Sequence, residues 1–315
     1  VDSVAIEWEN IPVALVKEIA AQKPVVVPPH LLATAQARHL EKQFFAQGPV
    51  PPVPYVFLPA DGRTTKTISD AIDNIPSEAK GHIPTVANIT FPAILKTDRL
   101  GYDGIGQWAV DNKEQVGAIV LSPQHQQTDF VLEQKIKLMA EGSVLVARDF
   151  DGHTVCYPMV ENKHEGGILR HTSLPARNIP EHLQAQAIAA SRTMADQLSL
   201  QGVLCIEFFI AKDATGAIKL LANEMAPRPH NSYHWTIEGT TTSQFAQLAR
   251  IALGFKVAPP LLTATELTMN NILGNDIEQY RQLGNEDDSF LHLYGKAESR
   301  PGRKMGHYTV IKKRC

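Results

Sequence analysis

Residues 202–209, Gly-Val-Leu-Cys-Ile-Glu-Phe-Phe, and residues 220–224, Leu-Leu-Ala-Asn-Glu, are two apolar segments that each contain a glutamate. Short apolar runs of this kind predict buried strands, and antiparallel neighbours would bring Glu207 and Glu224 together. A glutamate in a buried strand is costly unless it pairs with a cation or binds metal. Mg²⁺ prefers such carboxylates, and Asn223 adds a further oxygen. These residues alone leave a magnesium site and a structural ion pair equally open.

The segments around this pair predict an α+β fold. Strand-like runs at 91–96 and 144–148 precede the pair, and helical patterns lie near 180–200 and 242–253. Nearer the N-terminus, 4–8 has the pattern of a buried strand, and the apolar spacing predicts one helix from Pro29 to Gly48. The proline-rich stretch 48–54 cannot continue that helix and indicates a lobe boundary. Segment 60–90 is polar and aperiodic, which favours a surface insertion.

A glycine-rich segment, Lys96-Thr-Asp-Arg-Leu-Gly101-Tyr-Asp-Gly104-Ile-Gly106-Gln107, follows the strand-like run 91–95. Its glycines permit backbone amides to turn toward a phosphate, while Lys96 and Arg99 supply positive charge. The segment matches neither a Walker A motif nor a dinucleotide fingerprint. A phosphate-binding loop and an ordinary turn both remain open on this pattern alone.

Two polar loops are further candidates. The first, 223–235, contains Pro227 and Pro229 and suits a rigid loop that presents Arg228 and Asn231 to a ligand. His230 and His234 in it have the spacing of a zinc pair, which leaves zinc as an alternative. The second, 294–307, carries several basic residues around a Pro-Gly turn. It could clamp a phosphate monoester, although a solvated basic loop explains it equally well.

Composition narrows the class of protein. The chain has 315 residues, of which 43% are hydrophobic and 20% charged, so it can bury a full core in two or three lobes. A net charge of −3 gives no basic field for nucleic acid or an anionic membrane, and no apolar run is long enough to span a bilayer. The cysteines, Cys156, Cys205 and Cys315, suggest no disulfide framework. We therefore expect a cytoplasmic protein without nucleic-acid or membrane partners.

Four longer strings carry a family resemblance: LKTDRLGYDGIGQ, YPMVENKHEGGILR, NEMAPRPHNSYHWTIEGTTTSQF and RPGRKMGH. Together they resemble the ATP-grasp enzymes and, within them, the 5-(carboxyamino)imidazole ribonucleotide synthases of purine biosynthesis. The resemblance runs from about Val1 to Val310. It implies an ATP-grasp fold in which 1–52 is the remainder of a truncated Rossmann-like N-terminal domain. The ATP-grasp domain would be 53–255, with a central lid lobe at about 60–135, and 256–315 would be a small β-rich C-terminal lobe.

The resemblance also implies the site. The substrates would be ATP, bicarbonate and aminoimidazole ribonucleotide, with Mg²⁺ as cofactor, in a homodimeric ligase. Mg²⁺ would be held by Glu207, Glu224 and Asn223, and the ribonucleotide by Tyr102, Asp103, Lys296, Arg303 and Lys304. The catalytic residues would be Lys96, Asp103, Lys135, Arg228 and Asn231. ATP would be bound by Arg38, Lys96, Gly101, Tyr102, Asp103, Gly104, Ile105, Gly106, Gln107, Glu133, Gln134, Lys135, Ile136, Glu141, His164, Asn223 and Glu224.

The sequence departs from the family pattern in three places. Relatives begin with a Gly-rich βαβ segment, and we expect this sequence to enter the fold after it. Tyr233 replaces a usual glycine, and the stretch between Arg38 and Lys96 is longer than expected. These departures put ribonucleotide binding in more doubt than ATP binding. Two alternatives therefore stay open: another ATP-grasp carboxylate–amine ligase, and a non-catalytic nucleotide-binding remnant.

Overall fold

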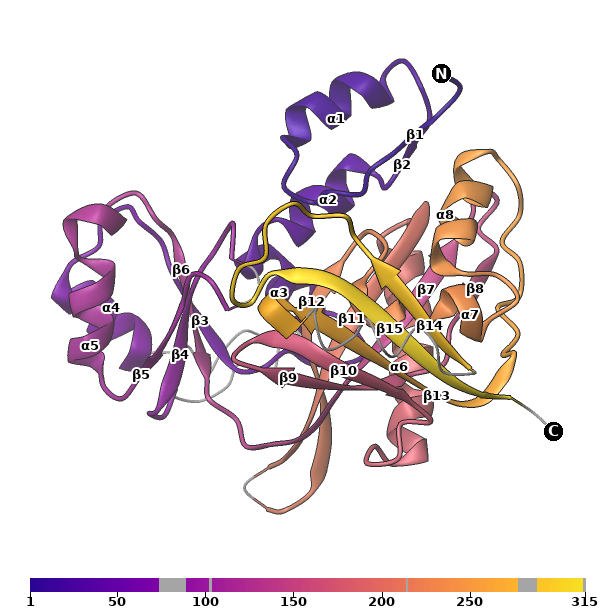
Figure 1. The fold of residues 1–315 in the computed structure, drawn as a ribbon. Coiled ribbons are helices and arrows are strands. Elements are labelled where there is room, and N and C mark those ends of the chain that lie inside the picture. The colour runs from indigo at the N-terminus through magenta and orange to yellow at the C-terminus, as the bar shows by residue number, and fades with distance from the viewer. Residues whose placement is uncertain (74–88, 102–103, 214, 277–287, 314–315) are drawn as a thin grey trace.

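The structure, a computed structural model, describes residues 1–73, 89–101, 104–213, 215–276 and 288–313. Residues 1–46 form two short parallel strands and three helices. The elements are β1 (Val4–Ala5), α1 (Val13–Ala20), β2 (Val25–Val26), α2 (Pro29–Ala35) and α3 (Arg38–Ala46). β1, β2, α1 and α2 lie at the top of Figure 1, and α3 lies lower, beside β12 (Ile218–Ala226).

Two predictions for this segment are wrong. The single helix expected from Pro29 to Gly48 is two helices, because Ala37 has an extended backbone (φ −129°) and Arg38 N–H donates to the carbonyl of Asp98 instead of continuing the α2 ladder. The buried strand expected at 4–8 is only two residues long, and Trp8 is 68% exposed. Local apolar spacing therefore overstated the length of both elements.

A four-stranded antiparallel sheet follows, with the order β3-β6-β4-β5. Together with two helices it forms a separate lobe at the left of Figure 1, with its own apolar core around Leu95, Phe130 and Leu132. The elements of this lobe are β3 (Tyr55–Leu58), α4 (Thr65–Asp73), β4 (Ala93–Thr97), β5 (Gln107–Val110), α5 (Lys113–Val120) and β6 (Phe130–Gln134). The polar segment 60–90 is thus in part a helix, while 74–88 lies outside the described residues.

The remaining strands form one nine-stranded sheet in the order β12-β11-β7-β9-β10-β13-β15-β14, with β8 paired to β7. This sheet and its helices confirm the predicted α+β class. The strands are β7 (Leu138–Arg148), β8 (Thr154–Cys156), β9 (Val160–Glu165), β10 (Ile168–Leu174), β11 (Gly202–Lys212), β12 (Ile218–Ala226), β13 (Ala264–Leu273), β14 (Ser289–Leu293) and β15 (Lys304–Lys313).

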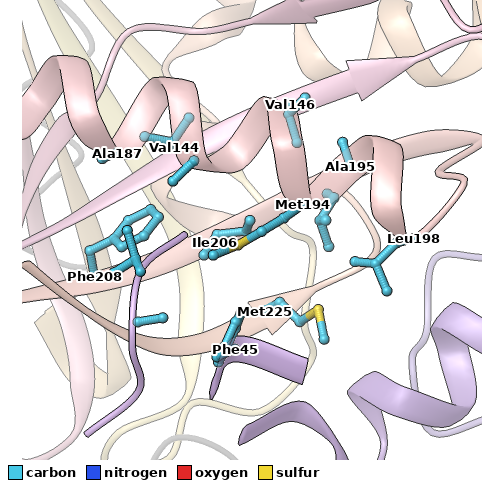
Figure 2. Packing of buried hydrophobic residues seen from close by; sticks show 14 of the residues in the cluster. Phe45, Val144, Val146, Ala187, Met194, Ala195, Leu198, Ile206, Phe208 and Met225 are labelled. Atoms are coloured by element: carbon cyan, nitrogen blue, oxygen red, sulfur yellow. The ribbon is translucent and has the colours of Figure 1, made fainter. Parts of the chain in front are cut away.

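Alternation along the strands gives this sheet two buried faces. Val144 and Val146 of β7 join one core with α6 (Glu181–Gln197), and Figure 2 shows Phe45 of α3 and Met225 of β12 in the same core. Leu145 of β7 instead joins a second core on the opposite face, where α8 (Gln244–Ala252) and α7 (Thr236–Gly239) pack. Cover on both faces fixes the register of β11 and β12 and hence the position of their glutamates.

Candidate functional site

Glu207 of β11 and Glu224 of β12 are direct partners across an antiparallel pair, as the sequence predicted. Paired residues project from the same face of a sheet, so two carboxylates share one site. Burial, and then the charge of Glu224, raise the pKa of Glu207 to about 7. Burial also acts to raise the pKa of Glu224, but Arg38, 3.5 Å away, and the other nearby cations keep it below its ordinary value. A shared cation would relieve this repulsion.

Further polar groups lie beside this pair. We call the strip formed by Glu207, Glu224, Asn223, Glu141 and His164 the carboxylate edge. The Oδ1 atom of Asn223 is buried and has no hydrogen-bond partner among the described residues. Glu141 of β7 pairs with His164 of β9. Burial acts to lower the pKa of His164, but its hydrogen bond to Glu141 and the charges of Glu207, Glu141 and Glu224 raise it overall. The carboxylate edge thus combines three carboxylates with an amide oxygen that still lacks a donor or cation.

Beside this edge lies a buried charge cluster. Glu133 of β6 receives the Nζ of Lys96 at 2.8 Å and that of Lys42 at 3.1 Å, and all three side chains are almost fully buried. Burial acts to raise the pKa of Glu133, but the two lysines lower it to about 2. Burial lowers the pKa of Lys96. The cluster ties β4 and β6 of the four-stranded sheet to α3.

The glycine-rich loop approaches the larger sheet closely. Gly104 has φ +82°, and a Cβ there would lie 3.0 Å from the carbonyl oxygen of Gly166. Gly167, in the turn between β9 and β10, has φ +81°, and its Cβ would lie 3.0 Å from the Cα of Gly104. Two glycine turns therefore touch backbone to backbone. The predicted site residues Tyr102 and Asp103 lie outside the described residues.

Three adjoining cavities form a groove along the elements described above. The Arg228 cavity and the Glu207 cavity share Arg38 and Glu224, whereas the Glu207 cavity and the Lys135 cavity share Lys96, Gly104, Gln107 and Phe209. The Arg228 cavity also contains Gly101, Asn231 and Lys304; the Glu207 cavity contains Ile105, Glu141, His164 and Asn223; and the Lys135 cavity contains Glu133, Gln134, Ile136 and Trp108.

The Arg228 cavity gathers the polar loop 223–235. Nε and Nη2 of Arg228 donate to the carboxylate of Glu9, at 2.9 and 3.1 Å. Asn231 has both amide atoms buried without a hydrogen-bond partner among the described residues. Lys304 lines the same cavity, whereas Lys296 donates to the Lys304 carbonyl. The unpartnered Nδ2 of Asn231 can donate to an anionic ligand, and its Oδ1 can accept from a hydroxyl of that ligand.

Several predicted residues lie elsewhere. Arg303 donates to the carbonyl of Glu298 and, like Lys296, lines none of the three cavities. Gly106 also lines none of them and instead accepts from Thr97 N–H. Lys135 is exposed in the Lys135 cavity and does not reach Arg228 and Asn231. The roles assigned to these residues therefore stay predictions.

The zinc alternative gains no support. His230 contacts the Ser232 hydroxyl at 2.8 Å and Glu207 at 3.5 Å, whereas His234 contacts Gln244. Within the described ranges, neither histidine belongs to a group of three convergent metal-ligating side chains. Burial, and then Arg228, hold the pKa of His230 well below its ordinary value, so it is neutral and suited to orient Glu207.

Sequence reasoning missed four charged residues of this site. Glu9 pairs with Arg228, and Lys42 pairs with Glu133. Glu41 is buried in the Arg228 cavity and accepts from Met225 N–H, while Asp98 binds α3. One signal was available: Arg38, Glu41 and Lys42 place three charges within the first turns of an otherwise amphipathic helix.

Comparison with known proteins decides the family. The ATP-grasp domain family matches residues 74–245, and the phosphoribosylaminoimidazole carboxylase C-terminal domain matches 268–314. The N5-carboxyaminoimidazole ribonucleotide synthase of Brucella melitensis is 34% identical over 99% of this chain and 80% of its own length. The chain belongs to the N5-carboxyaminoimidazole ribonucleotide synthase family. This membership confirms the predicted family, ATP-grasp fold and ligase class.

Two further relatives of this synthase family differ in extent. A bifunctional purine synthesis protein, purC/E, of Dictyostelium discoideum is 35% identical over 98% of this chain, which spans 31% of that protein. The ADP complex of N5-carboxyaminoimidazole synthetase from Staphylococcus aureus superposes with a TM-score of 0.82 at 27% identity, covering 99% of this chain and 76% of that one. Among the described residues, no helix has the length and apolar character needed to cross a membrane.

Proposed function

We propose that this chain carboxylates aminoimidazole ribonucleotide with bicarbonate at the expense of ATP, in purine biosynthesis. The observation that carries the proposal is the position of Glu207 and Glu224. This pair lies where the Arg228 and Lys135 cavities meet through the Glu207 cavity, so it can face the phosphates of a nucleotide on one side and an acceptor on the other.

The donor set fits Mg²⁺. Two opposed carboxylates and the unpartnered Oδ1 of Asn223 are hard oxygen ligands, and phosphate oxygens and water would complete the shell. Glu207, Glu224 and Asn223 would therefore hold the ion. When bound, Mg²⁺ neutralises charge on the phosphates and helps to align them for transfer.

We assign nucleotide binding to the Lys135 and Glu207 cavities together. The base would lie in the Lys135 cavity against Gln134, Lys135 and Ile136, and the ribose hydroxyls would face Glu141 and His164. Lys96, Arg38 and the glycine loop would bind the phosphates. Because Lys96 is already fixed by Glu133, its ammonium group needs no reorganisation when charge develops on the transferred phosphoryl group.

The acceptor chemistry belongs to the Arg228 cavity. Arg228 and Asn231 would bind bicarbonate, one oxygen of which attacks the γ-phosphorus to form carboxyphosphate and ADP. The ribonucleotide amine then takes the carboxyl carbon, phosphate leaves, and the amine loses a proton. Lys304 would bind the ribonucleotide phosphate, and Asp103 stays the predicted proton acceptor. The homodimer and the cytoplasmic location also stay predictions.

Phosphate release in the presence of aminoimidazole ribonucleotide and bicarbonate tests the proposal. We expect release to require both compounds, and Glu224→Ala to lose about 10² to 10³-fold in kcat, the range for one preorganised electrostatic group. Glu161→Ala is the matched control, because Glu161 lies on β9 outside the three cavities and accepts from Asn178. Nucleotide binding without turnover would contradict the proposal and favour a non-catalytic remnant.

A further inference from the structure

The start of α3 lacks a cap of its own. Its N-cap residue is Ala37, whose methyl group cannot accept a hydrogen bond, so the first helical N–H groups need partners from elsewhere. Asp98, which follows β4, supplies them. Its Oδ1 accepts from His39 N–H at 2.8 Å, and its backbone carbonyl accepts from Arg38 N–H at 2.9 Å. A carboxylate at a helix N-terminus is also favoured by the helix dipole.

The His39 side chain strengthens this contact. Its Nδ1 lies 2.9 Å from both carboxylate oxygens of Asp98, and its ring stacks on Phe57 of β3 at 4.3 Å. Asp98 and Phe57 both come from the four-stranded sheet lobe, whereas α3 packs on β12 of the larger sheet. His39 is therefore held on two sides by the lobe that also carries Lys96.

The contact also fixes the side chain of Arg38. Its Nε donates to the Thr97 carbonyl at 3.2 Å, its Nη2 to the Gly101 carbonyl at 3.3 Å, and its Nη1 lies 3.5 Å from Glu224. The guanidinium thus spans the strand end, the glycine loop and the glutamate pair. Its direction depends on where α3 begins relative to β4, which is the distance that Asp98 sets.

We propose that Asp98 is a positioning residue that holds Arg38 in place for the nucleotide phosphates. The inference rests on the proposed function, because it deepens the role of Arg38 there. Asp98 does not touch the nucleotide itself, since only 1% of its side chain is exposed. It acts through the backbone and side chain of α3.

A double-mutant cycle on MgATP binding tests this positioning role. We expect Asp98→Ala to weaken MgATP binding about 10 to 100-fold, as is typical when a group that orients a ligand-binding residue is lost. In the Arg38→Ala background the same change should have little further effect. Asp98→Asn keeps an oxygen for His39 N–H, so its MgATP dissociation constant should lie between those of wild type and Asp98→Ala. If Asp98→Ala fails to fold, the asparagine variant still tests the inference.

Asp149→Ala is the matched control. Asp149 is likewise buried, pairs with His153 at 3.2 Å and accepts from backbone N–H groups, but it lies at the β7–β8 turn. The Asp149→Ala substitution should lower the thermal midpoint of unfolding and leave the MgATP dissociation constant unchanged. Equal MgATP affinity in Asp98→Asn and wild type, or full additivity of Asp98→Ala with Arg38→Ala, would overturn the inference. Calorimetry with MgATP needs no acceptor, so its outcome is independent of whether the chain carboxylates the ribonucleotide.

Discussion

The two ends of the groove satisfy their polar groups in different ways. At the nucleotide end, the charged side chains pair within the protein: Lys96 and Lys42 with Glu133, and His164 with Glu141. At the acceptor end, both amide atoms of Asn231 are buried without a partner among the described residues. The charge cluster around Glu133 is therefore formed before a ligand arrives. Asn231 instead leaves hydrogen bonds for the ligand to complete, although Arg228 beside it is already paired with Glu9.

This difference predicts separate costs for mutation. Removing one member of a buried ion pair leaves an uncompensated charge and destabilises the fold. An amide that already lacks partners contributes little to stability, because its desolvation is not offset in the ligand-free protein. Changes in the Glu133 cluster should therefore lower stability, whereas a change at Asn231 should lower activity alone.

The largest expected effect is at the nucleotide end. Lys42→Met keeps the volume of a side chain that is 1% exposed but removes one of the two cations of Glu133. We expect a loss of about 3 kcal/mol in the free energy of unfolding, measured by urea denaturation without nucleotide. Lys163→Met, in an exposed pair with Glu165, should change it by less than about 1 kcal/mol. Equal losses in the two variants would remove the distinction between buried and exposed pairs.

The acceptor end should respond in the opposite way. Asn231→Leu replaces an unpartnered amide by an apolar group of similar shape, so the free energy of unfolding should stay the same or rise slightly. Carboxylation should fall about 10²-fold, as after loss of one oxyanion donor. In Asn162→Leu, by contrast, a buried amide loses bonds to Ser143 and Thr172, and stability should fall. A comparable loss of stability in Asn231→Leu would contradict the comparison.

The smallest effect, counted over one pH unit, concerns Glu41, which lies in the Arg228 cavity near the junction of the two ends. Burial, and then the charge of Glu224, raise the pKa of Glu41 from its ordinary value of 4.5 to about 8. The folded protein therefore retains a proton that the unfolded chain loses between these values, so this group's contribution to stability falls as pH rises through that window. In Glu41→Gln the free energy of unfolding, measured by urea denaturation at several pH values, should fall less steeply with pH, by up to about 1.4 kcal/mol per pH unit. Parallel slopes between pH 5 and 8 would exclude a neutral Glu41.

The features that the sequence predicted are those with a local pattern. The strands around Glu207 and Glu224 were predictable because apolar runs mark strands buried on both faces, and the register follows once those faces are covered. The glycine-rich turn was predictable from its three glycines, while its role toward a phosphate was left open. The partners of these groups were not predictable, because Lys96 and Glu133 are separated by 37 residues and Lys42 meets Asn223 across 181.

Tertiary contacts also explain the wrong expectations. The N–H groups of Arg38 and His39 donate to Asp98 instead of to the preceding helical turn. The single apolar pattern therefore forms two helices that separate at Ala37. Tyr233, where the family pattern has glycine, is fully buried between Tyr157 and Trp235, and its hydroxyl donates to the carbonyls of Ser143 and Pro158. It lines none of the three cavities, so this departure affects the core and not the groove.

The backbone contact between Gly104 and Gly167 sets the clearance between the two sheets at the groove. Because neither turn carries a side chain there, the two backbone segments approach more closely than any other residue would allow without a shift. A methyl group at position 104 or 167 would clash with the facing backbone and would push the two lobes apart. Sequence variation at these positions would therefore change the width of the groove, and with it the fit of the nucleotide, while the charged groups stayed the same.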